Sequence, residues 1–166
     1  MGSKETWELL SFIVTVIGLP LAITVFLWEQ RRERNNEEEE EYQLLADAYN
    51  DFLKVVLDNA DLHLRSHGSI TNLTADQEER MLVIFDMLIS LFERAYLVAY
   101  QPKMSSEKAR RWNSWEDYMR DWCRRDEFLN RLPTLLRGED PAFSGYIMRL
   151  ALEEKPDHLR ERQSLG

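Results

Sequence analysis

The chain has 166 residues, a formal net charge of −9 and a mean hydropathy of −0.48, averages that are typical of a soluble acidic domain. This acidity argues against DNA or RNA as a direct partner, because phosphate binding needs clustered lysines and arginines. The single cysteine, Cys123, excludes a disulfide framework and fits a reducing compartment.

Apolar residues are concentrated near the N-terminus, after a short tail over residues 1–6. From Leu9 to Trp28 the chain has 20 consecutive uncharged residues, about enough to cross a hydrocarbon core roughly 30 Å thick. Trp7 and Trp28 bracket this run and suit the two headgroup layers. Because no small-residue cleavage site follows the run, an uncleaved transmembrane helix over 7–28 is favoured over a signal peptide.

Charges on the two sides of this predicted span are unequal. Arg31, Arg32 and Arg34 follow it closely, whereas only Lys4 precedes it. Positive charge accumulates on the cytoplasmic side of membrane proteins. We therefore expect a bacterial inner-membrane protein with its N-terminus outside and its C-terminal domain in the cytoplasm. The three arginines and the two flanking tryptophans are candidate anchors to membrane lipid.

One face of the predicted span carries only small residues. They recur at helical spacing and are Ser11, Thr15, Gly18 and Ala22. Small residues let helices approach closely in lipid, so this face is a candidate packing or pore face of a homo-oligomer. Pro20 removes a backbone donor and predicts a kink. Small residues also occur in single anchors without such a role, and that alternative stays open.

Residues 29–41 contain no glycine or proline, so the helix is predicted to continue past the membrane as a charged juxtamembrane segment. The segment ends in an acidic run made of Glu37, Glu38, Glu39, Glu40 and Glu41. In a ring of copies these carboxylates would form an acidic vestibule that concentrates cations. In a single copy they would keep an exposed helix soluble.

The segment 42–154 has the apolar spacing of amphipathic helices, and no part of it alternates with a period of two. The predicted fold class is therefore all-α, with an N-terminal transmembrane helix that continues into a cytoplasmic helical bundle. The first bundle helix should reach about Arg65. The polar tail over 155–166 is predicted to fray.

Three N-terminal signals divide the rest of the bundle into helices: a capping box at Thr74 and Gln77, a serine cap at Ser105 or Ser106, and an Asp-Pro start at Asp140. Between the first two signals, a buried stripe is predicted. Its members are Met81, Phe85, Leu88, Ile89, Phe92, Ala95, Tyr96 and Ala99.

Three tryptophans, Trp112, Trp115 and Trp122, recur at helical spacing along one further stripe. They are a large apolar contribution for so small a domain. The pattern predicts that they form the core, or, if they are exposed, that they bind a partner.

The chain carries no glycine-rich phosphate loop, no Gly-x-Ser-x-Gly element and no acidic metal loop. His63 and His67 would share a helix face near Asp61, but no third ligand converges in the sequence, so a solvated turn is favoured over a metal site. We therefore expect no enzymatic activity, no metal and no cofactor.

The chain combines an anchor, an arginine-rich exit, a glutamate-rich helix and a Trp-x-x-Trp-x-x-Tyr element at Trp112, Trp115 and Tyr118. This order resembles a broad group of small bacterial single-pass membrane proteins. Within that architecture, the chain is similar to the membrane accessory proteins of type VI-B CRISPR systems. The resemblance implies a homo-oligomeric membrane pore that acts in antiviral defence by membrane permeabilisation, and it implies no catalytic residue.

The leading expectation is therefore a self-assembling inner-membrane pore or channel. An alternative is a membrane-tethered module whose cytoplasmic domain binds a partner protein or a ligand. A helical ribonuclease of the HEPN type is a further alternative. It is disfavoured because neither the pair Arg65 and His67 nor the pair Arg149 and His158 has the Arg–His spacing which that family uses.

Overall fold

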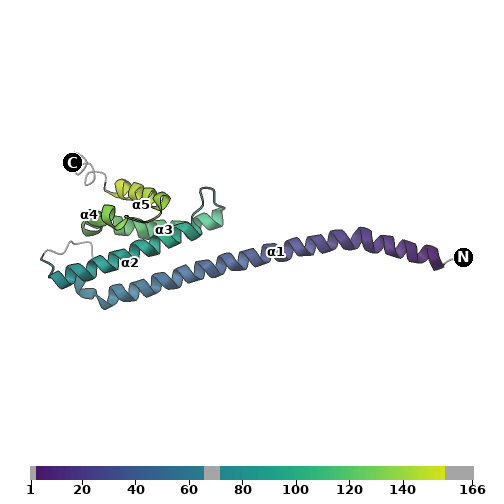
Figure 1. Cartoon of the computed structure of the whole chain (residues 1–166), viewed down its shortest axis with the longest axis horizontal. Coiled ribbons are helices and arrows are strands. Elements are labelled where there is room, and N and C mark those ends of the chain that lie inside the picture. The colour runs from purple at the N-terminus through teal and green to yellow at the C-terminus, as the bar shows by residue number, and fades with distance from the viewer. Residues whose placement is uncertain (1–2, 66–71, 156–166) are drawn as a thin grey trace. The chain divides into compact units, whose positions relative to one another are not determined.

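The computed structural model describes the backbone of residues 3–65 and 72–155, and side chains from Ile23 onward except at positions 34, 35, 37 and 38. All regular structure within these ranges is helical (Figure 1), which confirms the predicted all-helical fold. The elements are α1 (Ser3–Asp58), the 3-10 helix η1 (Ala60–Leu62), α2 (Ala75–Ala99), α3 (Ser106–Cys123), α4 (Asp126–Leu135) and α5 (Pro141–Glu154).

The chain divides into two units, Met1–Leu44 and Leu45–Gly166. In the first unit the described structure is the N-terminal part of α1. As far as their side chains are described, none of the helices contains a stretch long and apolar enough to cross a membrane. Most of the predicted span, positions 7–22, lies outside the described side chains.

The first bundle helix is shorter than the sequence predicts, because α1 ends at Asp58 and not near Arg65. The side-chain amide of Asn59 donates to the carbonyl of Val55 at 2.9 Å. Asparagine side chains that bind nearby backbone in this way compete with helix continuation. One turn of 3-10 helix follows, and His63 then adopts a left-handed conformation with φ of 45°.

The predicted N-terminal signals are confirmed. Thr74 and Gln77 form a complete capping box at the start of α2. Ser105, and not Ser106, caps α3 by accepting from the backbone N–H of Lys108 at 3.3 Å. The carboxylate of Asp140 accepts the first free N–H groups of α5, from Ala142 and Phe143. Each cap satisfies backbone donors that a helix leaves unpaired at its start.

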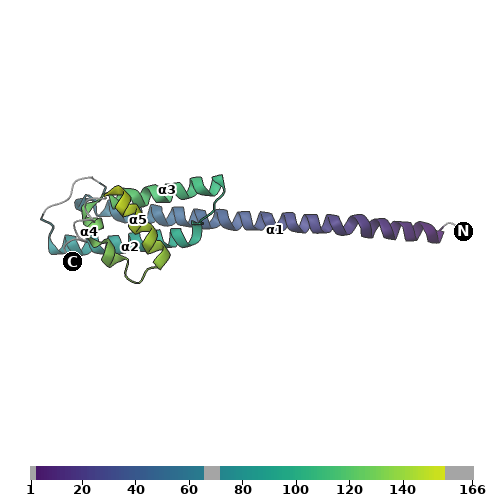
Figure 2. The same cartoon turned by 90° about the horizontal axis from the view of Figure 1, so that it is seen from above.

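Helices α2 and α3 pack against one another, and each of them also contacts α4 and α5 (Figure 2). Six residues of the predicted α2 stripe are buried: Met81, Phe85, Leu88, Ile89, Phe92 and Ala95. Tyr96 and Ala99 are half-buried and pack against this core. Ile84 and Leu91 are buried as well, because α2 is covered by several helices and not along a single stripe.

Candidate functional site

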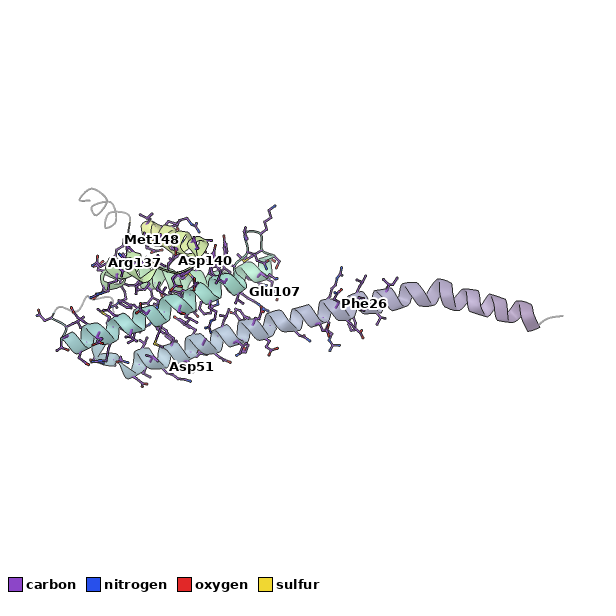
Figure 3. The ribbon with its side chains drawn as sticks, in the orientation of Figure 1. Phe26, Asp51, Glu107, Arg137, Asp140 and Met148 are labelled. Atoms are coloured by element: carbon purple, nitrogen blue, oxygen red, sulfur yellow. The ribbon has the colours of Figure 1, made fainter. Side chains whose placement is uncertain are left out.

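Large apolar side chains are exposed on α1 in the first unit. Phe26, labelled in Figure 3, is 63% exposed, and Trp28 is 62% exposed; Ile23, Val25 and Leu27 are each about half exposed. Successive helix positions are about 100° apart, so the four consecutive residues from Val25 to Trp28 surround the helix. The exposed apolar surface therefore extends around every side of this turn of α1.

A basic group follows these apolar residues. The guanidinium of Arg32 lies over the indole of Trp28, 5.7 Å from the ring centroid, within the range of cation–π attraction. Arg31 is exposed beside it. An apolar end followed by arginine is the residue order that suits a membrane–water interface.

Several predicted site residues have no described side chains. They are Trp7, Ser11, Thr15, Gly18, Pro20, Ala22, Arg34, Glu37 and Glu38. The packing face, the kink and part of the acidic vestibule therefore stay predictions. Of the acidic run, Glu39, Glu40 and Glu41 are described, and all three are exposed.

The three bundle tryptophans are core residues. Trp112, Trp115 and Trp122 are at most 3% exposed. Trp115 meets the ring of Tyr49 edge-on at 5.7 Å, and Trp122 meets Phe52 at 5.9 Å. These contacts fix the C-terminal part of α1 on α3, since edge-to-face aromatic pairs add to the burial energy. The exposed aromatic patch that a tethered binding module would use is therefore not formed by these three residues.

A polar network joins α3 to α5 near Trp112. The indole N–H of Trp112 donates to the hydroxyl of Tyr146 at 2.9 Å, and that hydroxyl donates to Glu116. Burial raises the pKa of Tyr146, and the hydrogen bond to Glu116 raises this pKa further. The network keeps the buried indole and hydroxyl hydrogen-bonded, as buried polar groups require.

Arg120 extends this network to the end of α5. Its guanidinium donates to Glu116 at 2.7 Å, to Glu153 at 2.7 Å and to Glu154 at 3.1 Å. Arg124 adds a 2.7 Å contact to Glu154. Every carboxylate of the cluster thus pairs with an arginine. This arrangement suits a structural contact between α3 and α5 better than an acid–base site.

A carboxyl pair lies between α2 and the turn that precedes α5. Glu93 accepts the backbone N–H of Asp140, and its carboxyl group is hydrogen-bonded to that of Glu139. This hydrogen bond, together with burial and the charges of Glu93 and Asp86, raises the pKa of Glu139 to about 7. Two carboxyl groups in contact share a proton more readily than both ionise.

The candidate metal-site residues do not converge within the described part of the chain. Asp61 accepts from Arg80 at 2.7 Å and from Gln77 at 3.2 Å, and these hydrogen bonds lower its pKa to about 2. No group of three or more potential metal ligands occurs among the residues that the structure describes. His67 and His158 lie outside them.

Cys123 is fully buried in the core of the bundle. Burial raises the pKa of its thiol to about 12. The thiolate, which is the nucleophilic form, is therefore scarce at neutral pH. Cys123 is therefore a small residue of the core.

The structure also contains a groove that the sequence did not indicate. It lies between α1 and α2, has a volume of about 380 Å³ and is lined by Val55, Asn59, Asp76, Glu79, Arg80, Val83, Ile84 and Met87. Val83 and Met87 are 53% and 42% exposed. In the sequence, Val83 and Met87 lie beside the predicted α2 stripe and are not part of it, and this position is the signal that could have indicated the groove.

Comparisons with known proteins identify no relative. No protein-family model matches the chain, and neither a curated protein nor a solved structure matches it.

Proposed function

We propose that the protein is a membrane-anchored helical protein that assembles into a homo-oligomeric pore and acts by permeabilising the membrane. The observation that carries the proposal is the apolar surface of residues 25–28, which surrounds α1. A helix that is apolar on all sides suits a membrane span, where lipid and neighbouring membrane helices surround it. These residues end the run of 20 uncharged residues that begins at Leu9.

The residues that follow support the same placement. Trp28 and Arg32 form an aromatic–cation pair one helical turn apart, and amphipathic rings and arginines are enriched at headgroup depth. With Arg31 and Arg34 they support a cytoplasmic location of the C-terminal unit under the positive-inside rule. A bacterial inner membrane is the proposed location.

Assembly is proposed from the small-residue face of the span, Ser11, Thr15, Gly18 and Ala22. Lipid provides no hydrophobic drive for association, so helices in a membrane associate through close packing of such residues. The bundle supports a pore more than a tethered receptor, because its three large aromatic candidates are core residues. A role in antiviral defence is proposed from the architectural resemblance alone.

The test is to purify the full chain in detergent, measure its mass by light scattering, and then measure dye release from vesicles containing it. We expect an oligomer and dye release. Gly18→Leu should abolish both, because leucine prevents close helix approach, whereas the matched variant Gly18→Ala should retain both. A monomer at micromolar concentration that releases no dye would contradict the proposal.

A further inference from the structure

The groove between α1 and α2 has an apolar floor and an acidic rim. Val55, Val83 and Met87 provide exposed or half-buried apolar surface. Glu79 lines the groove, and Asp86 is exposed next to Met87 along α2. We call these residues the acidic groove.

Arg80 lines the acidic groove and Lys54 precedes Val55 along α1, and both cations are already engaged within the chain. Arg80 donates to Asp61 at 2.7 Å and to Asp76 at 3.0 Å. Lys54 donates to Asp51 at 2.8 Å, one turn before Val55 on α1. The charged side chains at the groove therefore sum to a net negative charge. An occupant that is both apolar and basic would complement it.

A second surface of the same chain has this chemistry. In the last turn of α2, Leu97 and Val98 are 59% and 42% exposed. Residues 101–111 then contain four cations and one carboxylate: Lys103, Lys108, Arg110, Arg111 and Glu107. Glu107, labelled in Figure 3, lies at the start of α3 and pairs with Arg111 at 3.2 Å. We call this surface the basic corner.

The two surfaces are separated along α2. Val83 and Leu97 are 14 residues apart, which is about 21 Å along a helix. One copy therefore does not cover its own groove with its own corner. Two acidic grooves would repel one another across a two-fold axis, and so would two basic corners. The complementary arrangement between copies joins unlike surfaces, which is a heterologous contact.

We infer that the acidic groove of one copy binds the basic corner of the next, so that copies associate head to tail through their second units. This inference rests on the proposed homo-oligomer and identifies its interface outside the membrane. Head-to-tail contacts form rings when the rotation between copies closes, and open filaments when it does not. Copies that share one membrane orientation rotate about the membrane normal, which favours a ring.

The test exchanges charge between the two surfaces in the full chain in detergent. The first variant, Lys103→Glu with Arg110→Glu, makes the corner acidic. The second, Glu79→Lys with Asp86→Lys, makes the groove basic. Each variant alone places like charges against one another, so light scattering should show monomers. An equal mixture restores opposite charges at both kinds of contact and should recover the wild-type oligomer mass.

The matched control carries the same change in charge elsewhere. Arg131→Glu with Arg137→Glu alters α4 and its following turn and should leave the oligomer intact. Circular dichroism spectra and thermal midpoints show whether each variant folds. Oligomers that persist in both swapped variants overturn the inference and leave the proposed pore standing, whereas a monomeric wild type overturns the pore as well.

Lipid is the other possible occupant of a basic and apolar corner. If Lys103→Glu with Arg110→Glu keeps the oligomer mass but reduces binding to phosphatidylglycerol vesicles relative to phosphatidylcholine vesicles, the corner binds lipid and the inference fails. Failure of the mixture to assemble, with both variants folded and monomeric, also overturns it.

Discussion

The carboxyl group of Glu139 is hydrogen-bonded to the carboxyl group of Glu93, and this contact joins the turn before α5 to α2. Glu93 also accepts the backbone N–H of Asp140, the residue that caps α5. One carboxyl pair therefore holds the start of the last helix against the second helix. The pair needs a shared proton, which makes this junction sensitive to pH.

We expect the bundle to lose stability between about pH 5 and pH 8. Folding raises the pKa of Glu139 from its usual 4.5 to about 7, so the folded protein holds this proton more tightly than the unfolded chain. The contribution is fully present below the usual pKa and is lost as the pH rises through 7. Thermal midpoints in matched buffers measure the loss.

Glu139→Gln should flatten this pH dependence and should raise the thermal midpoint at pH 8, because the amide donates to Glu93 without a titrating proton. The control is Asp117→Asn, which neutralises an exposed carboxylate on α3. An equal flattening in the control would show that general charge reduction, and not the pair, is responsible.

Tyr146→Phe should destabilise the bundle by about 1–3 kcal/mol in urea denaturation, the usual range when buried polar groups lose their partner. The substitution removes the hydroxyl that accepts from Trp112 and donates to Glu116. Tyr118→Phe is a suitable comparison, since Tyr118 stacks on Tyr49 and is half-buried. Equal losses for both variants would refute a special contribution from the hydroxyl.

Cys123 should resist alkylation by iodoacetamide at pH 8 while the bundle is folded. Burial shields its sulfur and raises its pKa to about 12, so little thiolate is present to react. Mass spectrometry after timed labelling should show modification only after denaturant is added. Rapid modification of the folded protein would mean that the core opens readily at α3.

Salt should weaken assembly if the acidic groove binds the basic corner. The Debye length falls from about 10 Å at 0.1 M to about 3 Å at 1 M salt, so exposed charges attract less. We expect the oligomer fraction in detergent to fall across this range, and the control with altered Arg131 and Arg137 to fall equally. Assembly that strengthens with salt would point to a purely apolar contact.

Local signals were sufficient for much of the fold. The caps at Thr74, Ser105 and Asp140 depend on residues within three positions, so the sequence predicts them directly. The predicted end of the first bundle helix near Arg65 was wrong, because α1 ends at Asp58, where the Asn59 side chain bonds the carbonyl of Val55. The ion pair of Asp61 with Arg80, 19 positions away, follows this end, and such a contact has no local pattern.

The candidate site also has one part that is local in the sequence and one part that forms only through long-range packing. The apolar run before Arg31 is visible in the sequence because it is contiguous. The acidic groove is not, because Val55 and Val83 become neighbours only when α1 and α2 pack. The burial of Trp112, Trp115 and Trp122 followed from their helical spacing, although the hydrogen bond of Trp112 to Tyr146 on α5 did not.

The distribution of indoles gives the protein two built-in fluorescent reporters. Trp112, Trp115 and Trp122 are enclosed in the bundle, whereas Trp28 is 62% exposed. Emission from the three enclosed indoles should change when the bundle unfolds. Quenching by brominated lipid should act on Trp28 and on Trp7, which bracket the predicted span, and should spare the three enclosed indoles. Folding and the proposed membrane insertion can therefore be followed separately in an unlabelled chain, with Trp7→Phe and Trp28→Phe identifying which signal is which.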